Sequence, residues 1–291
     1  MIGTHAEGIN NIAAGKYSHA EGQKTIAVYG AHAEGKNTKA VGQTSHTEGF
    51  CTVGSGNNSH AEGRETKSEG YASHAEGQES EAKGVAAHAE GYKTEALAAY
   101  SHAEGNETKS NGQNSHAEGY KTETKASYSH AEGNETITEG EAAHAEGYKT
   151  YAKNKYSHAE GNDTQARGDS THVEGIGTRA RIEGQHVQGK YNLIDYSDSQ
   201  GKVGFAHIVG NGSSDSERSN AHTLDWNGNA WFAGDIKIGG SNYNEGEPLL
   251  TFDSVVGNYT YQLEDGTSIN QDITVRMALE HYIRNYMLPK N

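Results

Sequence analysis

Residues 101–112 read Ser-His-Ala-Glu-Gly-Asn-Glu-Thr-Lys-Ser-Asn-Gly, and variants of this unit recur along the first two thirds of the chain. A histidine marks every copy: His5, His19, His32, His46, His60, His74, His88, His102, His116, His130, His144, His158, His172 and His186. The step is 14 residues, except for 13 between His19 and His32. An acid follows two residues after each histidine (Gln188 in the last copy), and a glycine follows three residues after. A fixed period of this kind predicts a solenoid whose units stack on one another.

Small residues alternate with larger polar residues inside a unit. In 101–105, Ser, Ala and Gly alternate with His102 and Glu104, and 108–112 repeats the pattern with Thr, Ser and Gly. A period of two predicts strands, and the pairs between them predict turns. Each unit is therefore one coil of two short strands and two tight turns. Parallel stacking adds about 4.8 Å per coil, hence roughly 60 Å for the whole stack, and we expect Ser, Ala, Gly and Thr to face inward.

Composition indicates how such a segment folds. The chain has 291 residues, and Leu, Ile, Val and Phe number 15 in residues 1–190 but 22 in residues 191–291. So few apolar residues cannot offset chain entropy through an ordinary side-chain core. The first two thirds is therefore not a globular enzyme domain, and backbone hydrogen bonds between coils must order it.

Several classes of protein are excluded by composition. No run approaches the length of a membrane span, so we expect no membrane insertion, and residues 1–30 lack the features of a signal peptide. A single cysteine, Cys51, rules out intrachain disulfides and a thiolate zinc cluster. With a formal net charge of −15 and no cluster of Lys or Arg, we expect no nucleic-acid partner, because such binding depends on neutralising phosphates.

The two outward faces of the coil differ. Second-strand positions such as Lys39, Lys67 and Ile137 vary between copies, as a solvated surface does, whereas the first-strand His and Glu hardly vary. We therefore predict that the first-strand face is buried against further copies of the chain around a symmetry axis. There the imidazoles and carboxylates would hydrogen-bond between chains. The predicted interchain ladder comprises His19, Glu21, His60, Glu62, His74, Glu76, His88, Glu90, His102, Glu104, His116, Glu118, His130, Glu132, His144, Glu146, His158, Glu160, His172 and Glu174.

A catalytic interpretation of this ladder is weak. Catalysis needs one constellation whose pKa values are pushed apart, and many near-identical copies are the opposite, so we predict no enzyme and no catalytic residue. Three histidines around a threefold axis offer ligands for a divalent ion such as Zn or Ni. Because a glutamate beside each histidine supplies a metal-free partner, we predict a structural ladder without a metal ion or cofactor.

The repeat resembles the YadA-like head repeats of trimeric autotransporter adhesins, which are 14-residue units of the form Ser-x-Ala-x-Gly followed by a second small-residue strand. The resemblance covers about residues 4–190. It implies an all-β fold, a left-handed parallel β-roll assembled as a homotrimer, with the roll as a first domain at 1–190. This chain departs from those heads at the two x positions. The adhesin heads usually carry Val and Ile there, whereas this chain carries His and Glu.

The composition changes after the repeats. Residues 223–226 and 229–232 predict a hairpin around Asn227-Gly228, a pair typical of a type I′ turn, and we expect Trp226 and Trp231 in a core. The series at 187–240 resembles a module common in phage tail-fibre and tail-spike proteins, in which residues 189–192 would close the roll. We assign 191–247 to this β-rich module.

A helix is predicted in the last segment, 248–291. Val275, Ala278, Leu279, Tyr282, Ile283 and Tyr286 have helical spacing. Asn270 or Asp272 would cap the helix.

These inferences together predict a structural and host-recognition component of a phage tail fibre or a related tail-like particle. Its partners would be two further copies of itself, a host cell-surface receptor (a glycan or a surface protein) and other tail proteins. It would be made in the host cytoplasm and act in the virion tail. The alternative is a bacterial surface adhesin of the trimeric autotransporter type. A polysaccharide-cleaving tail spike is disfavoured because no isolated carboxylate pair stands out.

Overall fold

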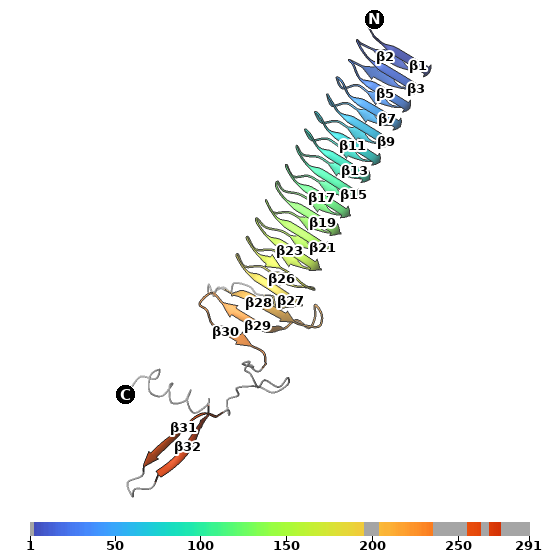
Figure 1. The fold of residues 1–291 in the computed structure, drawn as a ribbon. Helices are drawn as coiled ribbons and strands as arrows, with labels where there is room; N and C mark the ends of the chain where they lie inside the picture. The colour runs from blue at the N-terminus through green and yellow to red at the C-terminus, as the bar shows by residue number, and fades with distance from the viewer. Residues whose placement is uncertain (1–2, 195–203, 235–254, 263–267, 275–291) are drawn as a thin grey trace. The chain divides into compact units, whose positions relative to one another are not determined.

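The structure, a computed structural model, describes residues 3–194, 204–234, 255–262 and 268–274. Contacts divide the chain into two units, residues 1–230 and 231–291. The first unit is a parallel β-solenoid in which every coil contributes two strands (Figure 1). All regular elements of the described residues are strands, so the predicted all-β solenoid is confirmed.

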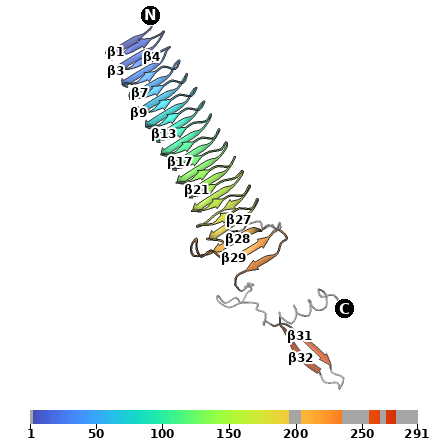
Figure 2. The same ribbon diagram turned by 180° about the vertical axis from the view of Figure 1, so that it is seen from behind.

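The strands that begin at the repeated histidines form one face of the solenoid, seen from both sides in Figures 1 and 2. They are β1 His5–Ile9, β3 His19–Gln23, β5 His32–Lys36, β7 His46–Phe50, β9 His60–Arg64, β11 His74–Gln78, β13 His88–Tyr92, β15 His102–Asn106, β17 His116–Tyr120, β19 His130–Asn134, β21 His144–Tyr148, β23 His158–Asn162, β25 His172–Val173 and β27 His186–Lys190.

The strands after the first turn of each coil form a second sheet, which has 13 strands within the described residues. They are β2 Ile12–Ala14, β4 Ile26–Val28, β6 Lys39–Ala40, β8 Val53–Gly54, β10 Lys67–Ser68, β12 Glu81–Ala82, β14 Glu95–Ala96, β16 Lys109–Ser110, β18 Glu123–Thr124, β20 Ile137–Thr138, β22 Tyr151–Ala152, β24 Gln165–Ala166 and β26 Arg179–Ala180.

Stacking brings equivalent residues of successive coils into register. β15 and β17 pair in parallel with His102 opposite His116 and Glu104 opposite Glu118. The 13-residue step does not disturb this order, because β3 and β5 still pair with His19 opposite His32. The missing residue is therefore absorbed in a turn and not in a strand.

The core between the two sheets consists of small side chains. Ala103 and Ala117 are fully buried, as are Thr108 and Ser110, which confirms the predicted inward positions of Ala, Ser and Thr. Where a serine precedes the histidine it can also stabilise the second turn, as the Ser115 hydroxyl does by donating to the carbonyl of Gly112 at 2.6 Å. Two sheets this close leave room for little more than a methyl or hydroxyl group.

The first-strand glycine does not face the core, contrary to expectation. Gly105 has φ +110°, and a Cβ there would lie 2.2 Å from the carbonyl oxygen of Gly119 in the next coil. Only glycine permits this approach. The alternation of small residues along the strand therefore has two causes, core packing for Ala103 and contact between coils for Gly105.

The end of the repeat region differs between the two sheets. The first sheet continues past residue 190, because β28 Phe205–Asn211 pairs in parallel with β27 and sets His207 opposite His186. The second sheet ends near Asn192, whose buried side-chain amide accepts from Arg179 N (2.8 Å) and donates to Arg179 O (3.0 Å). The expectation that 189–192 closes the roll thus holds for the second sheet and is wrong for the first.

The predicted hairpin is present with a different turn. β29 Asn220–Asp225 runs antiparallel to β28, and β30 Ala230–Phe232 pairs with β29. Only Gly228 of the Asn227-Gly228 pair has positive φ, whereas a type I′ turn needs two such residues. The Asp225 carboxylate explains the change, because it accepts from the backbone N–H groups of Asn227 (2.9 Å) and Asn229 (2.8 Å).

Two further expectations for the carboxyl-terminal third are wrong. Trp226 and Trp231 are about half exposed and not buried in a core. β31 Val255–Gln262 and β32 Ser268–Thr274 form an antiparallel pair, and Asn270 and Asp272 lie in β32, where they cannot cap a helix. The predicted helix at 275–286 lies outside the described residues. Among the described residues, no helix has the length and apolar composition required to cross a membrane.

Candidate functional site

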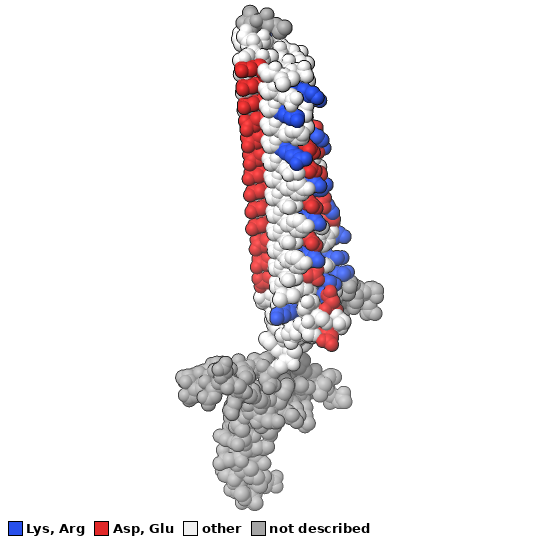
Figure 3. Space-filling model, turned by 90° about the vertical axis from the view of Figure 1, so that its right-hand side faces the viewer, with Lys and Arg blue, Asp and Glu red and all other residues white. Residues whose placement is uncertain are grey.

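The candidate site is the His/Glu ladder, the outward face of the first-strand sheet. The imidazole rings of successive coils stack, for example His88 on His102 at 4.7 Å between ring centroids with planes 3° apart. The glutamates two residues further along each strand form a parallel row, which appears as a continuous acidic column in Figure 3. Thus the structure brings together all the histidines and glutamates predicted for the ladder, on one face of one chain.

Within each coil, histidine and glutamate approach without forming a hydrogen bond. The Nε2–Oε2 distance is 3.5 Å in the pair His74–Glu76, 3.4 Å in His144–Glu146 and 4.0 Å in His102–Glu104. These distances exceed the usual length of an N–H···O bond. Residues i and i+2 share a face of a strand, but the pleat holds their polar ends slightly too far apart.

The imidazole nitrogens are consequently buried without partners. The Nε2 atoms of His19, His60, His74, His88, His102, His116, His130, His144, His158 and His172 all lack contact with solvent and lack a hydrogen-bond partner among the described residues. The rest of each ring is accessible, since the His102 and Glu104 side chains are 34% and 42% exposed. A buried nitrogen without a partner costs free energy, and a row of carboxylates one coil apart repels itself. The ladder is thus electrostatically incomplete in one chain.

Burial and stacking also affect protonation. Burial lowers the pKa of His102, and the neighbouring His116 and His88 lower this pKa further, while Glu104 and Glu90 oppose the change. The pKa values of His32, His74, His116, His144, His158, His186 and His207 are likewise lowered, with burial as the largest cause. Burial and the neighbouring imidazoles therefore favour the neutral form of these eight histidines.

The same atoms are candidate ligands for a metal ion. In the group His60, Glu62 and His74 the possible ligand atoms lie within 4.8 Å of one another, and the groups His74–Glu76–His88 and His88–Glu90–His102 repeat this arrangement. One Zn²⁺ ion binds each nitrogen at about 2.0–2.1 Å, whereas the stacked rings of His60 and His74 stand 4.7 Å apart. One ion would reach both imidazoles only if they left the stack, so the geometry disfavours coordination of one ion by two stacked histidines of one chain.

The ladder continues beyond the predicted set, which ends at His172, to His186 and then to a further rung at His207. His207 of β28 lies next to His186 with ring centroids 5.1 Å apart and ring planes tilted by 41°, and its Nε2 lies 3.1 Å from Nε2 of Gln188. His222 of β29 meets His207 edge-on at 5.5 Å. The sequence does carry a signal for this rung, because His207 and Gly210 keep the His-x-x-Gly spacing of the repeat.

A second charged column follows the first turn of the coils, as the mixed red and blue column of Figure 3 shows. Lys121 lies 3.8 Å from Glu107 of the preceding coil and 5.0 Å from the ring centroid of Tyr120. Equivalent contacts recur every second coil, at Lys93 and Lys149. Exposed pairs of this kind add little stability, so this column is a solvated surface.

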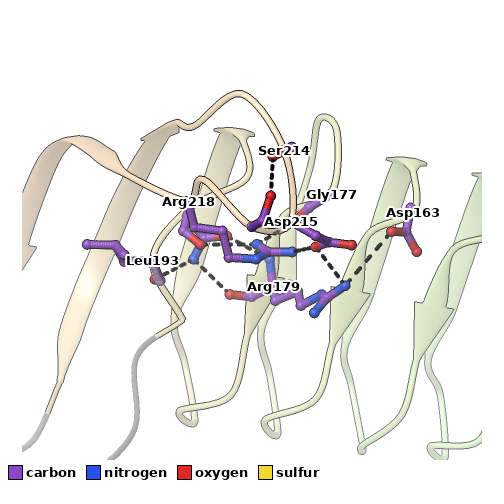
Figure 4. Close-up of polar contacts among 9 residues, drawn as sticks. Asp163, Gly177, Arg179, Leu193, Ser214, Asp215 and Arg218 are labelled. Atoms are coloured by element: carbon purple, nitrogen blue, oxygen red, sulfur yellow. Dashed lines mark hydrogen bonds and ion pairs between the residues drawn. The ribbon is translucent and has the colours of Figure 1, made fainter.

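An arginine clamp holds the last coil to the loop after β28 (Figure 4). Arg218 Nη1 donates to the carbonyls of Gly177 (2.8 Å) and Asn192 (3.1 Å), and Nη2 donates to the carboxylate of Asp215. Arg179 of β26 contacts the same carboxylate at 3.0 Å. The Arg218 side chain is only 9% exposed, whereas Asp215 is 57% exposed, so the bonds to the two carbonyls are the ones partly shielded from water, and they close the end of the second sheet.

We expect Arg218→Met to destabilise this end of the roll by about 3 kcal/mol, because two carbonyls and a carboxylate lose a charged donor. Amide hydrogen exchange should increase over residues 177–192 and remain unchanged in the coils near residue 60. Arg64→Met is the control, since Arg64 is 60% exposed and contacts only surface groups, the neighbouring Glu65 and the ring of Phe50 at 6.0 Å among the described residues. Equal exchange in the two variants would show that Arg218 has no clamping role.

The fold and the ladder together define a parallel β-solenoid with one stacked His/Glu rung in each coil. No protein-family model matches this chain, and no curated protein matches it at a significant level.

Proposed function

We propose that the chain is a structural and host-recognition component of a phage tail fibre or related tail-like particle, and that it acts as a homotrimer of left-handed β-rolls. The observation that carries the trimer is the incomplete ladder. Buried Nε2 atoms without partners lie beside half-exposed glutamates in coil after coil. A further chain against this face would give the imidazole N–H groups carboxylate acceptors and would give the carboxylates N–H donors.

The composition of the core also supports assembly. In most coils the largest buried side chains are alanine, serine and threonine, and a buried methylene contributes only about 0.8 kcal/mol. Larger buried side chains, such as Val173, Val187 and Ile208, gather near the last coils. A single roll thus obtains little stabilisation from apolar burial, and packing of three rolls adds burial along the whole length.

The role in a tail fibre rests on the resemblance of 187–240 to a tail-fibre module and on what a trimeric roll can do mechanically. Three chains present every surface three times, so weak contacts with a host receptor add through effective concentration. The proposed partners are a receptor of the host surface and other tail proteins, and the proposed location is the virion tail. Fluorescently labelled intact protein should adsorb to cells of a susceptible bacterium and to none of the resistant strains.

Removing two rungs of the ladder should weaken the trimer. The double variant His102→Ser, His116→Ser leaves Glu104 and Glu118 without partners from a neighbouring chain. We expect light scattering to give three times the chain mass of 31.1 kDa for the unaltered protein and a mass shifted towards one chain for the variant. The dissociation should appear at a protein concentration about tenfold higher than for the unaltered protein.

A matched control changes the opposite face. Lys67 and Glu81 face outward from adjacent second strands and pair with each other at 3.5 Å, so the double variant Lys67→Ser, Glu81→Ser should keep the trimer. An unchanged mass and melting temperature for the histidine variant would argue that the ladder faces solvent.

A further inference from the structure

The one 13-residue step of the repeat lies beside a hollow in the surface of the roll. The 13-residue coil, residues 19–31, lacks one residue at the second turn, where Val28, Tyr29, Gly30 and Ala31 replace the longer turn of other coils. The backbone ladder survives this deletion, since Tyr29 N donates to Ala14 O and Thr44 N donates to Tyr29 O, both at 3.2 Å. The deletion therefore changes the shape of the edge and leaves its hydrogen bonds intact.

A cleft lies at this edge. Its lining includes Lys16, Tyr17, Tyr29, Gly30, Gln43 and Asn57. The space at Gly30 is open, since a Cβ there would have no heavy atom nearer than 3.7 Å. None of the residues lining the cleft is acidic, although the chain carries a formal net charge of −15.

Two aromatic side chains project beside the cleft. Tyr17 and Tyr29 are each 68% exposed, and both have a left-handed backbone, with φ 62° and 49°. Tyrosine is unfavourable in that conformation, which asparagine and glycine adopt more readily. Other coils hold asparagine at this turn position, at Asn58 and Asn114, or an exposed tyrosine, at Tyr100, Tyr128 and Tyr156. What distinguishes Tyr17 and Tyr29 is therefore the cleft that they line.

The polar groups of the cleft have free bonding capacity. The side chain of Asn57 accepts from Gln43 N at 3.0 Å through its carbonyl oxygen, and its amide N–H groups point to no acceptor among the described residues. Lys16 adds an ammonium group at the rim. Exposed aromatic faces with amide donors beside them suit a pyranose ring, whose C–H face stacks on an aromatic ring while its hydroxyls take hydrogen bonds.

We propose that this cleft binds a saccharide of the host surface, with a sugar ring stacked on Tyr29 or Tyr17 and hydroxyl groups bonded to Gln43, Asn57 and Lys16. This inference rests on the proposed function and specifies the receptor as a glycan and its site as the 13-residue coil. In a trimer each fibre would carry three such clefts, so individually weak binding would add.

The test uses intact protein on a panel of immobilised oligosaccharides that contain neutral hexoses, N-acetylhexosamines and uronic or sialic acids. The variant Tyr29→Asn places at the turn a residue that other coils use there. We expect it to lose about tenfold in apparent affinity for the bound glycan. Lengthening the turn 28–31 by one residue, to the 14-residue form, should abolish binding by filling the cleft. The melting temperature should change little in both variants.

Tyr100→Asn is the matched control. Tyr100 is also exposed and left-handed, with φ 58°, but it lies in a 14-residue coil, and binding should persist in this variant. Glycan binding that survives both Tyr29→Asn and the lengthened turn would overturn the proposed binding site. The proposal would also be overturned if no glycan of the panel bound the unaltered protein, or if Tyr29→Asn lost the trimer. Adsorption to host cells that persists in both cleft variants would leave the proposed function standing and refute only this site. Failure of the unaltered protein to adsorb to cells would instead contradict the proposed function.

Discussion

Alanine at Gly119 is expected to break the roll at its centre. Gly119 has φ +110°, and a Cβ there would lie 2.1 Å from the carbonyl oxygen of Gly133 and 3.0 Å from its carbonyl carbon. Both atoms belong to the backbone of the next coil, so no side chain can move aside. The parallel ladder between β17 and β19 would have to open, and we expect a loss of about 4 kcal/mol or more.

The measurement is thermal unfolding followed by circular dichroism, together with limited proteolysis. Because each coil contacts only its neighbours, cleavage should concentrate near residues 119–133. Gly228→Ala is the control: Gly228 also has positive φ, at +86°, but no atom lies within 4 Å of the position of a Cβ. It should therefore show only the cost of the backbone conformation, about 1 kcal/mol. Equal melting temperatures for the two variants would contradict the close contact between coils.

Acid is expected to destabilise the protein. The folded state lowers the pKa of His32, His74, His102, His116, His144, His158, His186 and His207 from the ordinary value of 6.5. The unfolded chain thus binds more protons than the folded chain as the pH falls below about 7. Stability is complete above that pH and declines as the pH falls through the ordinary pKa and then the lowered one. Burial between chains would strengthen this lowering of the pKa, and carboxylate acceptors from a neighbouring chain would oppose it.

We expect the melting temperature to be constant from about pH 7.5 to pH 8 and to fall by several degrees towards pH 5. The groups that face a rung such as His102 are the adjacent His88 and His116, which favour the fall, and Glu90 and Glu104, which oppose it. Replacing His102 and His116 by Gln should reduce the slope. A melting temperature that is flat over this range, or that rises in acid, would contradict the prediction. It would show that the neighbouring glutamates raise the histidine pKa values by as much as burial lowers them, or by more.

The sequence was sufficient to predict the coil. A period of 14 with alternating small residues placed Ala103 and Thr108 in the core, because this alternation has one solution in a thin two-sheet roll. It could not distinguish Gly105 from Ala103, since the reason for Gly105 is the carbonyl of Gly119 in another coil. Contacts between coils are invisible to a pattern that describes one coil.

The errors beyond residue 190 arose where one side chain overrides a local pattern. Asn227-Gly228 favours a type I′ turn in isolation, but the Asp225 carboxylate binds the backbone of Asn227 and Asn229 and selects another turn. His207 escaped notice because the interval after His186 is longer than the repeat, although β28 returns to the same register.

The sequence was sufficient to predict which residues form the ladder, but not the distances and hydrogen bonding between them. The repeated His-x-Glu places both groups on one face, yet only the structure shows Nε2 and Oε2 atoms 3.4–4.0 Å apart and the nitrogens without partners. Likewise the 13-residue step was evident in the sequence, but a cleft beside Tyr29 follows only when the strands around the shortened turn keep their register.

The most direct test of the account is the structure of the intact protein in solution by electron cryo-microscopy. It should show three rolls side by side around a common axis, with coils about 4.8 Å apart and with His102 and Glu104 facing a neighbouring chain. A single roll whose histidine and glutamate columns are surrounded by solvent would contradict it.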